Sequence, residues 1–271
     1  MLFKFEHYLD RIGLSDVPPG AAGLAALQAA HMRAIPFENI DPLLGQVPSL
    51  AIEDIVAKLV HGGRGGYCFE QNALFGAALT AFGYAPLAVL ARVHDPSGQS
   101  GARSHHAFVV AADGTNWLCD TGFGGAGALD PLDLSLGTPQ AAANGTYRVR
   151  VDRGSGVTTL DREAGGVWTP LYAFDAAPVK PVDFEAANYL CARWDGAPFS
   201  ANLMLAFHAP DGRVGLFNRA LTRGMRTDAV STLLGDVDDL AAVLCDTCGL
   251  GLRKDQLVEI WDRIASAPTR R

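Results

Sequence analysis

The sequence is poor in cysteine and has no long apolar run. Its five cysteines among 271 residues are odd in number and unevenly spaced. A disulfide framework is therefore not expected, and a reducing cytoplasm is the simpler predicted location. No run of apolar residues reaches the ~20 that a membrane span needs. The first residues also lack the apolar segment of a signal peptide.

Clusters of basic residues are scarce as well. Lysine and arginine number 22 against 29 aspartates and glutamates, which gives a formal net charge of −7. A nucleic-acid surface or a polybasic membrane patch needs grouped basic side chains, so neither partner is expected. The pair Cys245 and Cys248 has no second ligand pair at zinc spacing, so no metal site is expected. The oligomeric state leaves no trace in the sequence.

What the chain does contain changes in character twice along its length. Residues 1–85 favour helices, as in AIEDIVAKLV, where apolar residues recur at intervals of four. Residues 86–185 consist mostly of short β-rich runs separated by glycine, proline, aspartate and asparagine. Residues 186–271 mix strand-like runs with two late helices near 236–247 and 254–265. This order of elements predicts an α+β fold of three lobes. Since 49% of the residues are apolar, the chain can also bury a sizeable core.

One cysteine stands in a setting that favours chemistry. The run CFEQNALFGAALTAFG predicts a helix from Cys68 that ends at Gly83, preceded by the glycine-rich stretch HGGRGGY. First-turn N–H groups and the positive end of the helix dipole favour a thiolate, so a lowered pKa is expected. The same N–H groups can stabilise an oxyanion. A buried structural cysteine is the alternative, and these residues alone leave both open.

A histidine and an aspartate are predicted to lie together on a hairpin. If Asp113 and Gly114 form a two-residue turn, Ala107 faces Asp120. Alternate residues share a face of the strand, so His105 and Asp120 are diagonal neighbours while His106 points the other way. Such a pair can orient an imidazole as a base for a thiol. A purely structural hydrogen bond is the alternative at this point.

These stretches together resemble the arylamine N-acetyltransferase family. The resemblance is dense over roughly residues 5–125 and also selects His105 over His106 by its spacing from Asp120. The motifs that carry it are YLDRIGL (8–14), IPFENID (35–41), RGGYCFEQN (64–72), RSHHAFVV (103–110) and LCDTGFGG (118–125).

The resemblance implies an N-terminal helical bundle, a central β-barrel and a C-terminal α/β lid with a cysteine-protease-like Cys-His-Asp core. It also implies ping-pong transfer of acetyl from acetyl-CoA, without a metal, to the nitrogen of arylamines or arylhydrazines, or to the oxygen of N-hydroxyarylamines. Cys68 would carry the acetyl group, His105 would act as general base and acid, and Asp120 would orient His105.

Further roles follow from the same resemblance. Glu38 and Arg64 resemble an ion pair that supports the cysteine loop; a surface pair worth ~0–1 kcal/mol is the alternative. Other positions match the acceptor and donor sites. The acceptor walls would be Phe37, Phe123 and Phe199, and the donor site Ser104, Gly122, Gly124 and Gly125.

The chain also departs from the family. The family has a motif P-x-S-x-F near the start of the lid. Pro198 and Ser200 match it, but Asn202 stands where the phenylalanine is expected, and Phe199 partly replaces the missing ring. Three alternatives remain. One is a macrolactam-forming relative, another is a cysteine hydrolase or transglutaminase-like enzyme, and the last is a non-catalytic binding module.

Overall fold

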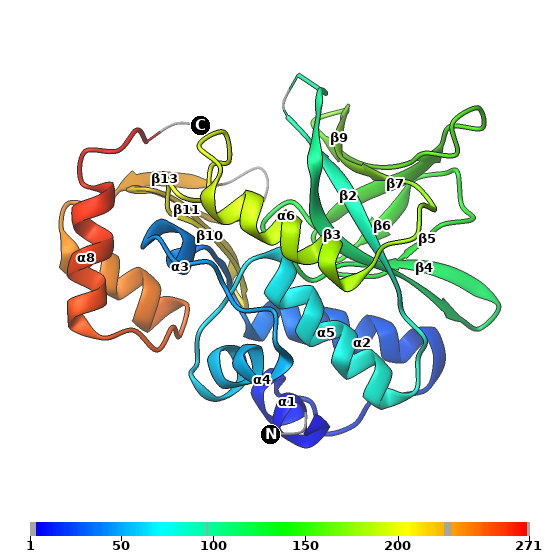
Figure 1. Cartoon of the computed structure of the whole chain (residues 1–271), viewed down its shortest axis with the longest axis horizontal. Coiled ribbons are helices and arrows are strands. Elements are labelled where there is room, and N and C mark those ends of the chain that lie inside the picture. Colours follow the sequence, from blue (N-terminus) through cyan, green and yellow to red (C-terminus); the bar gives the residue numbers. More distant parts are fainter. Residues whose placement is uncertain (1–3, 96, 225–228, 270–271) are drawn as a thin grey trace.

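The computed structural model describes residues 4–95, 97–224 and 229–269. Helices gather at the N-terminal end of the chain, as expected (Figure 1). They are α1 (Phe5–Ile12), α2 (Gly20–Ala34), α3 (Ile40–Leu43), α4 (Ile52–Ile55), the π-helical turn η1 (Val56–His61) and α5 (Cys68–Phe82). The helix predicted over 51–60 is therefore α-helical only at its start. No helix of the described residues is long and apolar enough to cross a membrane.

Helix α5 forms the centre of this bundle and begins at the cysteine. Its inner face buries Leu74, Phe75 and Ala78 in a cluster with α1 and α2. The Glu70 carboxylate accepts a hydrogen bond from the N–H of Tyr67 at 3.2 Å, which caps the first turn. Gly83 follows the last turn with φ of 102°, a left-handed conformation that favours glycine. The predicted helix boundaries are confirmed.

A strongly curved sheet of eight antiparallel strands follows, in the order β5-β4-β3-β2-β9-β8-β7-β6. The strands are β2 (Leu87–His94), β3 (Ser100–Ala112), β4 (Thr115–Cys119), β5 (Leu132–Asp133), β6 (Gln140–Ala142), β7 (Gly145–Val151), β8 (Thr158–Ala164) and β9 (Val167–Phe174). The concave side encloses apolar side chains, among them Val89, Leu118 and Tyr147. The sheet thus forms the barrel-like lobe on the right of Figure 1.

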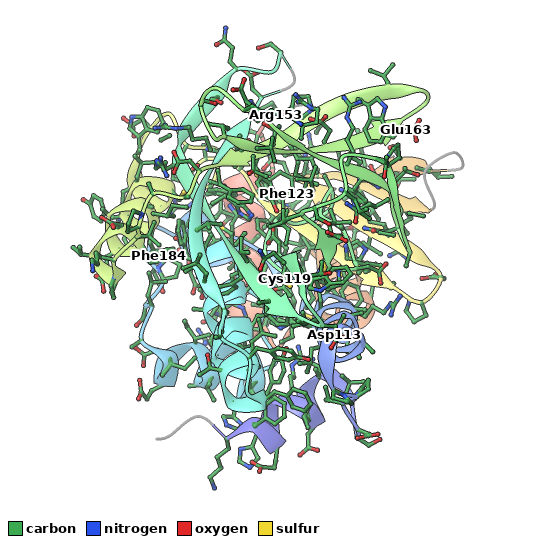
Figure 2. The ribbon with its side chains drawn as sticks, turned by 90° about the vertical axis from the view of Figure 1, so that its right-hand side faces the viewer. Asp113, Cys119, Phe123, Arg153, Glu163 and Phe184 are labelled. Carbon is green, nitrogen blue, oxygen red and sulfur yellow. The ribbon has the colours of Figure 1, made fainter. Side chains whose placement is uncertain are left out.

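The hairpin β3–β4 has the predicted register. Asp113 and Gly114 form its turn, both with positive φ (51° and 77°), as a two-residue type I′ turn requires. Phe108 pairs with Cys119, which is the expected alignment. Figure 2 shows Asp113 at the turn, Cys119 near the middle of the view at the far end of β4, and Phe123 above it. This register places His105 of β3 close to Asp120, which follows the last residue of β4.

The C-terminal part joins a second sheet to the bundle. Helix α6 (Pro181–Arg193) crosses between the two sheets (Figure 1). The second sheet runs β1-β10-β11-β12-β13, so a short strand from the N-terminal third forms its edge. Its members are β1 (Phe37–Glu38), β10 (Met204–Ala209), β11 (Gly212–Phe217), β12 (Ala220–Gly224) and β13 (Val230–Leu233), covered by α7 (Val237–Ala241), the π-helical turn η2 (Ala242–Thr247) and α8 (Lys254–Ile264). The α+β class and the two late helices are confirmed.

Candidate active site

The glycines before Cys68 allow the chain to pack closely against other backbone. A side-chain carbon at Gly65 would lie 2.1 Å from the carbonyl oxygen of Pro36, and one at Gly66 would lie 2.8 Å from the Glu70 carboxylate. Real Cβ atoms do not approach other atoms so closely, so neither position accepts a larger residue without a shift. The loop is thus held tightly and delivers Cys68 to the first position of α5.

The Cys68 sulfur is buried among backbone groups. It lies 3.7 Å from the carbonyl oxygen of Ser104, and the N–H groups of His106 and Phe69 donate to it. Burial, the largest effect, raises the thiol pKa well above its ordinary value, and these two donors lower it only in part. The expectation that the helix terminus lowers this pKa is therefore wrong, because burial outweighs it.

His105 and Asp120 meet as the hairpin predicts. His105 Nε2 lies 2.7 Å from Asp120 Oδ2, and both side chains are buried. Burial, the largest single effect, raises the pKa of the Asp120 carboxyl. The charge of His105 and donors on His105, Asn72 and Gly122 outweigh it and hold the pKa below its usual value. Asp120 is thus a carboxylate that accepts the Nε2 hydrogen of His105. Nδ1 of His105 is left without a hydrogen bond among the residues described.

His106 lies on the opposite face of β3, as expected. Its ring is 4.6 Å from the ring of Phe108 and 4.4 Å from that of Phe184, between centroids. Burial and the nearby His105 lower the pKa of His106 to about 3. A histidine kept neutral among aromatic rings serves packing, so the choice of His105 over His106 as the partner of Asp120 is confirmed.

Two residues that hold Asp120 were missed by the sequence analysis. Asn72 donates from Nδ2 to Asp120 Oδ1 at 3.0 Å and to the carbonyl oxygen of His106 at 2.7 Å. Gln28 Oε1 accepts the Asp120 N–H at 3.1 Å. The position of Asn72 four residues after Cys68, on the same helix face, was a usable signal. Gln28 lies on α2, far from Asp120 in the sequence, so no local sequence pattern indicates this contact.

A cavity of about 1760 Å³ opens in front of Cys68 and His105. Every predicted pocket residue lines it: Phe37, Ser104, Gly122, Phe123, Gly124, Gly125 and Phe199. The ring of Phe123 lies 5.1 Å from that of His105, and the ring of Phe199 lies 6.3 Å from that of Phe37. The structure therefore gathers these residues around one opening, with aromatic walls near the sulfur.

The atypical stretch contributes Phe199 to this wall. Phe199 also packs edge-on against Tyr67, with ring centroids 5.7 Å apart. Asn202 does not line the cavity; its Nδ2 donates to the carbonyl oxygen of Pro198, and its Oδ1 accepts from Asn218. Phe199, and not Asn202, therefore contributes to the cavity wall.

Glu38 and Arg64 form a buried pair behind the cysteine loop. Arg64 Nε and Nη2 lie 2.9 and 2.8 Å from Glu38 Oε1, and Nη2 also contacts Asp41 at 2.9 Å. Lys58 joins Asp41 to Glu70, at 2.7 and 2.6 Å. The Glu38 side chain is fully buried and that of Arg64 is 12% exposed. The alternative of a surface pair is therefore wrong.

The residues described contain no group of three or more histidine, cysteine, aspartate or glutamate side chains suited to a metal ion. Cys248 is buried at the end of η2, and Gly249 follows with φ of 68°. Cys245 and Cys248 thus lie at the end of a helical segment.

Comparison with known proteins gives one family. The family model described as "N-acetyltransferase" matches residues 22–257. The arylamine N-acetyltransferase of Mycolicibacterium smegmatis is 36% identical over 248 residues, covering 86% of this chain and 90% of that protein. The enzyme from Salmonella typhimurium has the same fold, with a TM-score of 0.89, 30% identity and coverage of 97% and 99% of the two chains.

A complex with CoA is known for a further relative. The structure of Mycobacterium marinum arylamine N-acetyltransferase in complex with CoA matches with a TM-score of 0.89 and 32% identity, over 96% of this chain and 99% of that one. The similarity spans both sheets and the helices, as well as the stretches around Cys68, His105 and Asp120. The chain therefore belongs to the arylamine N-acetyltransferase family of acetyltransferases.

Proposed function

We propose that this enzyme transfers an acetyl group from acetyl-CoA to aromatic amines and hydrazines in two steps, through an acetyl group on Cys68. The observation that carries the proposal is a buried thiol and a histidine–aspartate pair that share one cavity. N-hydroxyarylamine oxygen is a third acceptor of the same kind. No metal ion takes part.

In the first step Cys68 attacks the thioester carbonyl. Because burial raises the pKa of the isolated thiol, the proton must leave toward His105, and the imidazolium then stabilises the thiolate. Asp120 accepts the Nε2 hydrogen, which fixes the tautomer and leaves Nδ1 to receive the proton. First-turn N–H groups of α5 face the oxyanion that forms at the carbonyl.

In the second step the acceptor nitrogen attacks the acetyl group on Cys68. His105 removes the proton of the amine and returns one to the leaving sulfur. Phe37, Phe123 and Phe199 form an apolar wall suited to an aromatic ring. Ring stacking against this wall places the amine nitrogen beside the acetyl group.

The cavity also fits the acyl donor. Gly122 lies against the backbone of Cys68, since a side-chain carbon there would be 2.6 Å from the Cys68 Cα. Further along the cavity Arg162 and Arg213 supply positive charge. Ser104, Gly124 and Gly125 lie along the same wall and provide backbone and hydroxyl groups for a long flexible ligand. Glu38 and Arg64 hold the cysteine loop from behind.

The mass of the intact protein after mixing with acetyl-CoA tests the proposal. We expect one added acetyl group in the native protein, its removal by an arylamine such as aniline, and no adduct in Cys68→Ala. Cys191→Ser is the matched control, because Cys191 is a second buried thiol close to Cys68, and this variant should still gain the acetyl group.

Two outcomes count against the proposal. A folded native protein that gains no acetyl group would instead favour a hydrolase using the same residues, or a binding module. An adduct that survives Cys68→Ala would move the nucleophile to another residue.

A further inference from the structure

The far part of the cavity carries basic side chains that form no ion pair with a carboxylate among the described residues. Arg33, Arg162 and Arg213 line it, together with His208. Among the described residues Arg213 makes no hydrogen bond or ion pair. Arg162 donates only to carbonyl oxygens, those of Asn144 at 3.0 Å and Gly125 at 3.5 Å. The barrel, the second sheet and α2 thus bring like charges together.

These groups are close enough to repel one another. His208 and Arg213 are partners across β10 and β11. The pKa of Arg213 is lowered by its enclosure in the cavity and by Arg162, although its side chain stays accessible to water there. Burial, followed by the charges of Arg213, Arg162 and Arg33, lowers the pKa of His208 to about 4, so His208 joins the cluster as a neutral imidazole. His208 Nε2 is buried and has no partner in the described part of the chain.

The cluster lies within reach of a ligand that starts at Cys68. The Arg213 guanidinium rests on Gly125, where an added side-chain carbon would lie 1.9 Å from Nη2. Gly122 borders Cys68, and the chain from residue 122 to 125 spans at most about 11 Å. In acetyl-CoA the phosphates stand well away from the thioester, at the other end of a flexible arm.

We propose that Arg213, Arg162 and His208 bind the phosphate groups of the acyl donor. This proposal rests on the function proposed above and adds the residues that recognise the donor. Guanidinium groups match phosphate oxygens with paired N–H donors, and a polyanion relieves the repulsion within the cluster. A carboxylate on the acceptor is the competing source of negative charge.

Direct binding of CoA tests the assignment without relying on turnover. We expect Arg213→Gln to weaken CoA binding in calorimetry by roughly tenfold to a hundredfold, the range for hydrogen bonds to charged groups. Gly125→Ala should weaken it as well, because the new methyl group displaces the guanidinium. Arg253→Gln, which removes an exposed arginine paired with Asp255, is the control and should bind CoA as the native protein does.

Two further arms separate the possible ligands. Acetylation of Cys68 by 4-nitrophenyl acetate, a donor without phosphate, should proceed at the same rate in Arg213→Gln and the native protein. This measurement also reports on the reactivity of the Cys68 thiol independently of CoA binding. Unchanged CoA affinity in Arg213→Gln would overturn the proposal. Unchanged CoA affinity with a raised KM for 4-aminobenzoate but not for aniline would assign the cluster to the acceptor instead.

A different observation concerns Cys191 on α6. Its sulfur lies 3.5 Å from the Ser104 carbonyl oxygen, the same atom that the Cys68 sulfur contacts at 3.7 Å. The two sulfurs are therefore at most about 7 Å apart, and they share one apolar cluster. Cys68 faces the cavity, whereas Cys191 does not line it.

We propose that Cys191 forms a disulfide with Cys68 when a peroxide oxidises the site. Hydrogen peroxide transfers one oxygen to the Cys68 sulfur, giving a sulfenic acid and water. The Cys191 sulfur then attacks the Cys68 sulfur, the S–O bond breaks, and a second water leaves with the Cys191 proton. The disulfide blocks the Cys68 sulfur until it is reduced again, and it prevents further oxidation of that sulfur.

Intact mass under non-reducing conditions tests this disulfide. The native protein should lose two hydrogens after mild peroxide treatment, and dithiothreitol should restore both mass and thiol reactivity. In Cys191→Ser the sulfur of Cys68 should instead gain two or three oxygens, which dithiothreitol does not remove. Appearance of those oxygens in the native protein at the same rate as in Cys191→Ser would overturn the proposal.

Discussion

Removing Arg64 should destabilise the protein far more than loss of an ordinary surface ion pair. In Arg64→Met the fully buried Glu38 carboxylate loses both guanidinium contacts. Among the described residues it keeps the Ile40 N–H at 2.6 Å as a hydrogen-bond donor, and Lys58 remains as a cation nearby but makes no ion pair with it. Breaking a buried pair by removing one partner costs about 3–5 kcal/mol, because a buried charge is left unpaired. An exposed pair would cost only about 0–1 kcal/mol. The two magnitudes do not overlap, so the measurement separates the two cases.

Urea unfolding, followed by circular dichroism, measures this loss as a change in the free energy of unfolding. Arg253→Met is the matched control, since Arg253 contacts Asp255 through the same two nitrogens but in full solvent. It should leave the urea midpoint unchanged within error. The double variant Glu38→Gln with Arg64→Met should recover part of the loss, because no lone charge remains. Equal losses for Arg64→Met and Arg253→Met would refute the reasoning.

Three further predictions follow from the site and the core. Asp120→Asn should slow acetylation of Cys68 by roughly 10²–10⁴-fold, as measured by stopped flow, and should leave the urea midpoint unchanged. An acetylation rate equal to that of the native protein would remove Asp120 from the mechanism. In His105→Gln, the pH midpoint for alkylation of Cys68 by iodoacetamide should shift above ~8.5, because burial raises the pKa of a thiol that has lost its base. A pH midpoint equal to that of the native protein would exclude His105 as the base of Cys68. Buried His31 and His106, with pKa lowered mainly by burial to about 4 and about 3, stay neutral in the fold while the unfolded chain takes up protons below ~6.5. Stability should therefore be complete above that pH and fall by about 3 kcal/mol for His31 alone as pH drops to 4; urea midpoints that stay constant from pH 7 to 4 would contradict this.

Local patterns predicted those parts of the site that depend on local geometry. The glycine after Asp113 fixed a two-residue turn, and the turn fixed the register that brings His105 to Asp120. The spacing of apolar residues gave α5, and hence the position of Cys68 on it. Each of these steps uses residues close in sequence, where the period of a strand or helix decides which side chains share a face.

The contacts between distant parts of the chain left little sequence signal. Gln28 holds the Asp120 backbone from α2, and Arg213 reaches Gly125 from β11. Asn202, which stands where a phenylalanine is expected, bonds to Asn218 and does not line the cavity, whereas Phe199 lies on the cavity wall near Phe37. Packing of three lobes against one another decides such contacts, and no periodicity in the sequence encodes how the lobes meet.

The Cys68 thiol shows why placement alone does not fix reactivity. A helix terminus and two N–H donors favour the thiolate, yet a buried charge costs more than they return. In the proposed mechanism the thiolate is stabilised by a counter-charge on His105, which lines the same cavity as Cys68. Asp120, held by Asn72 and Gly122, accepts the Nε2 hydrogen of His105 and so orients its ring. The proposed mechanism therefore ties the reactivity of Cys68 to proton transfer to His105, and each support of Asp120 acts on the sulfur through that histidine.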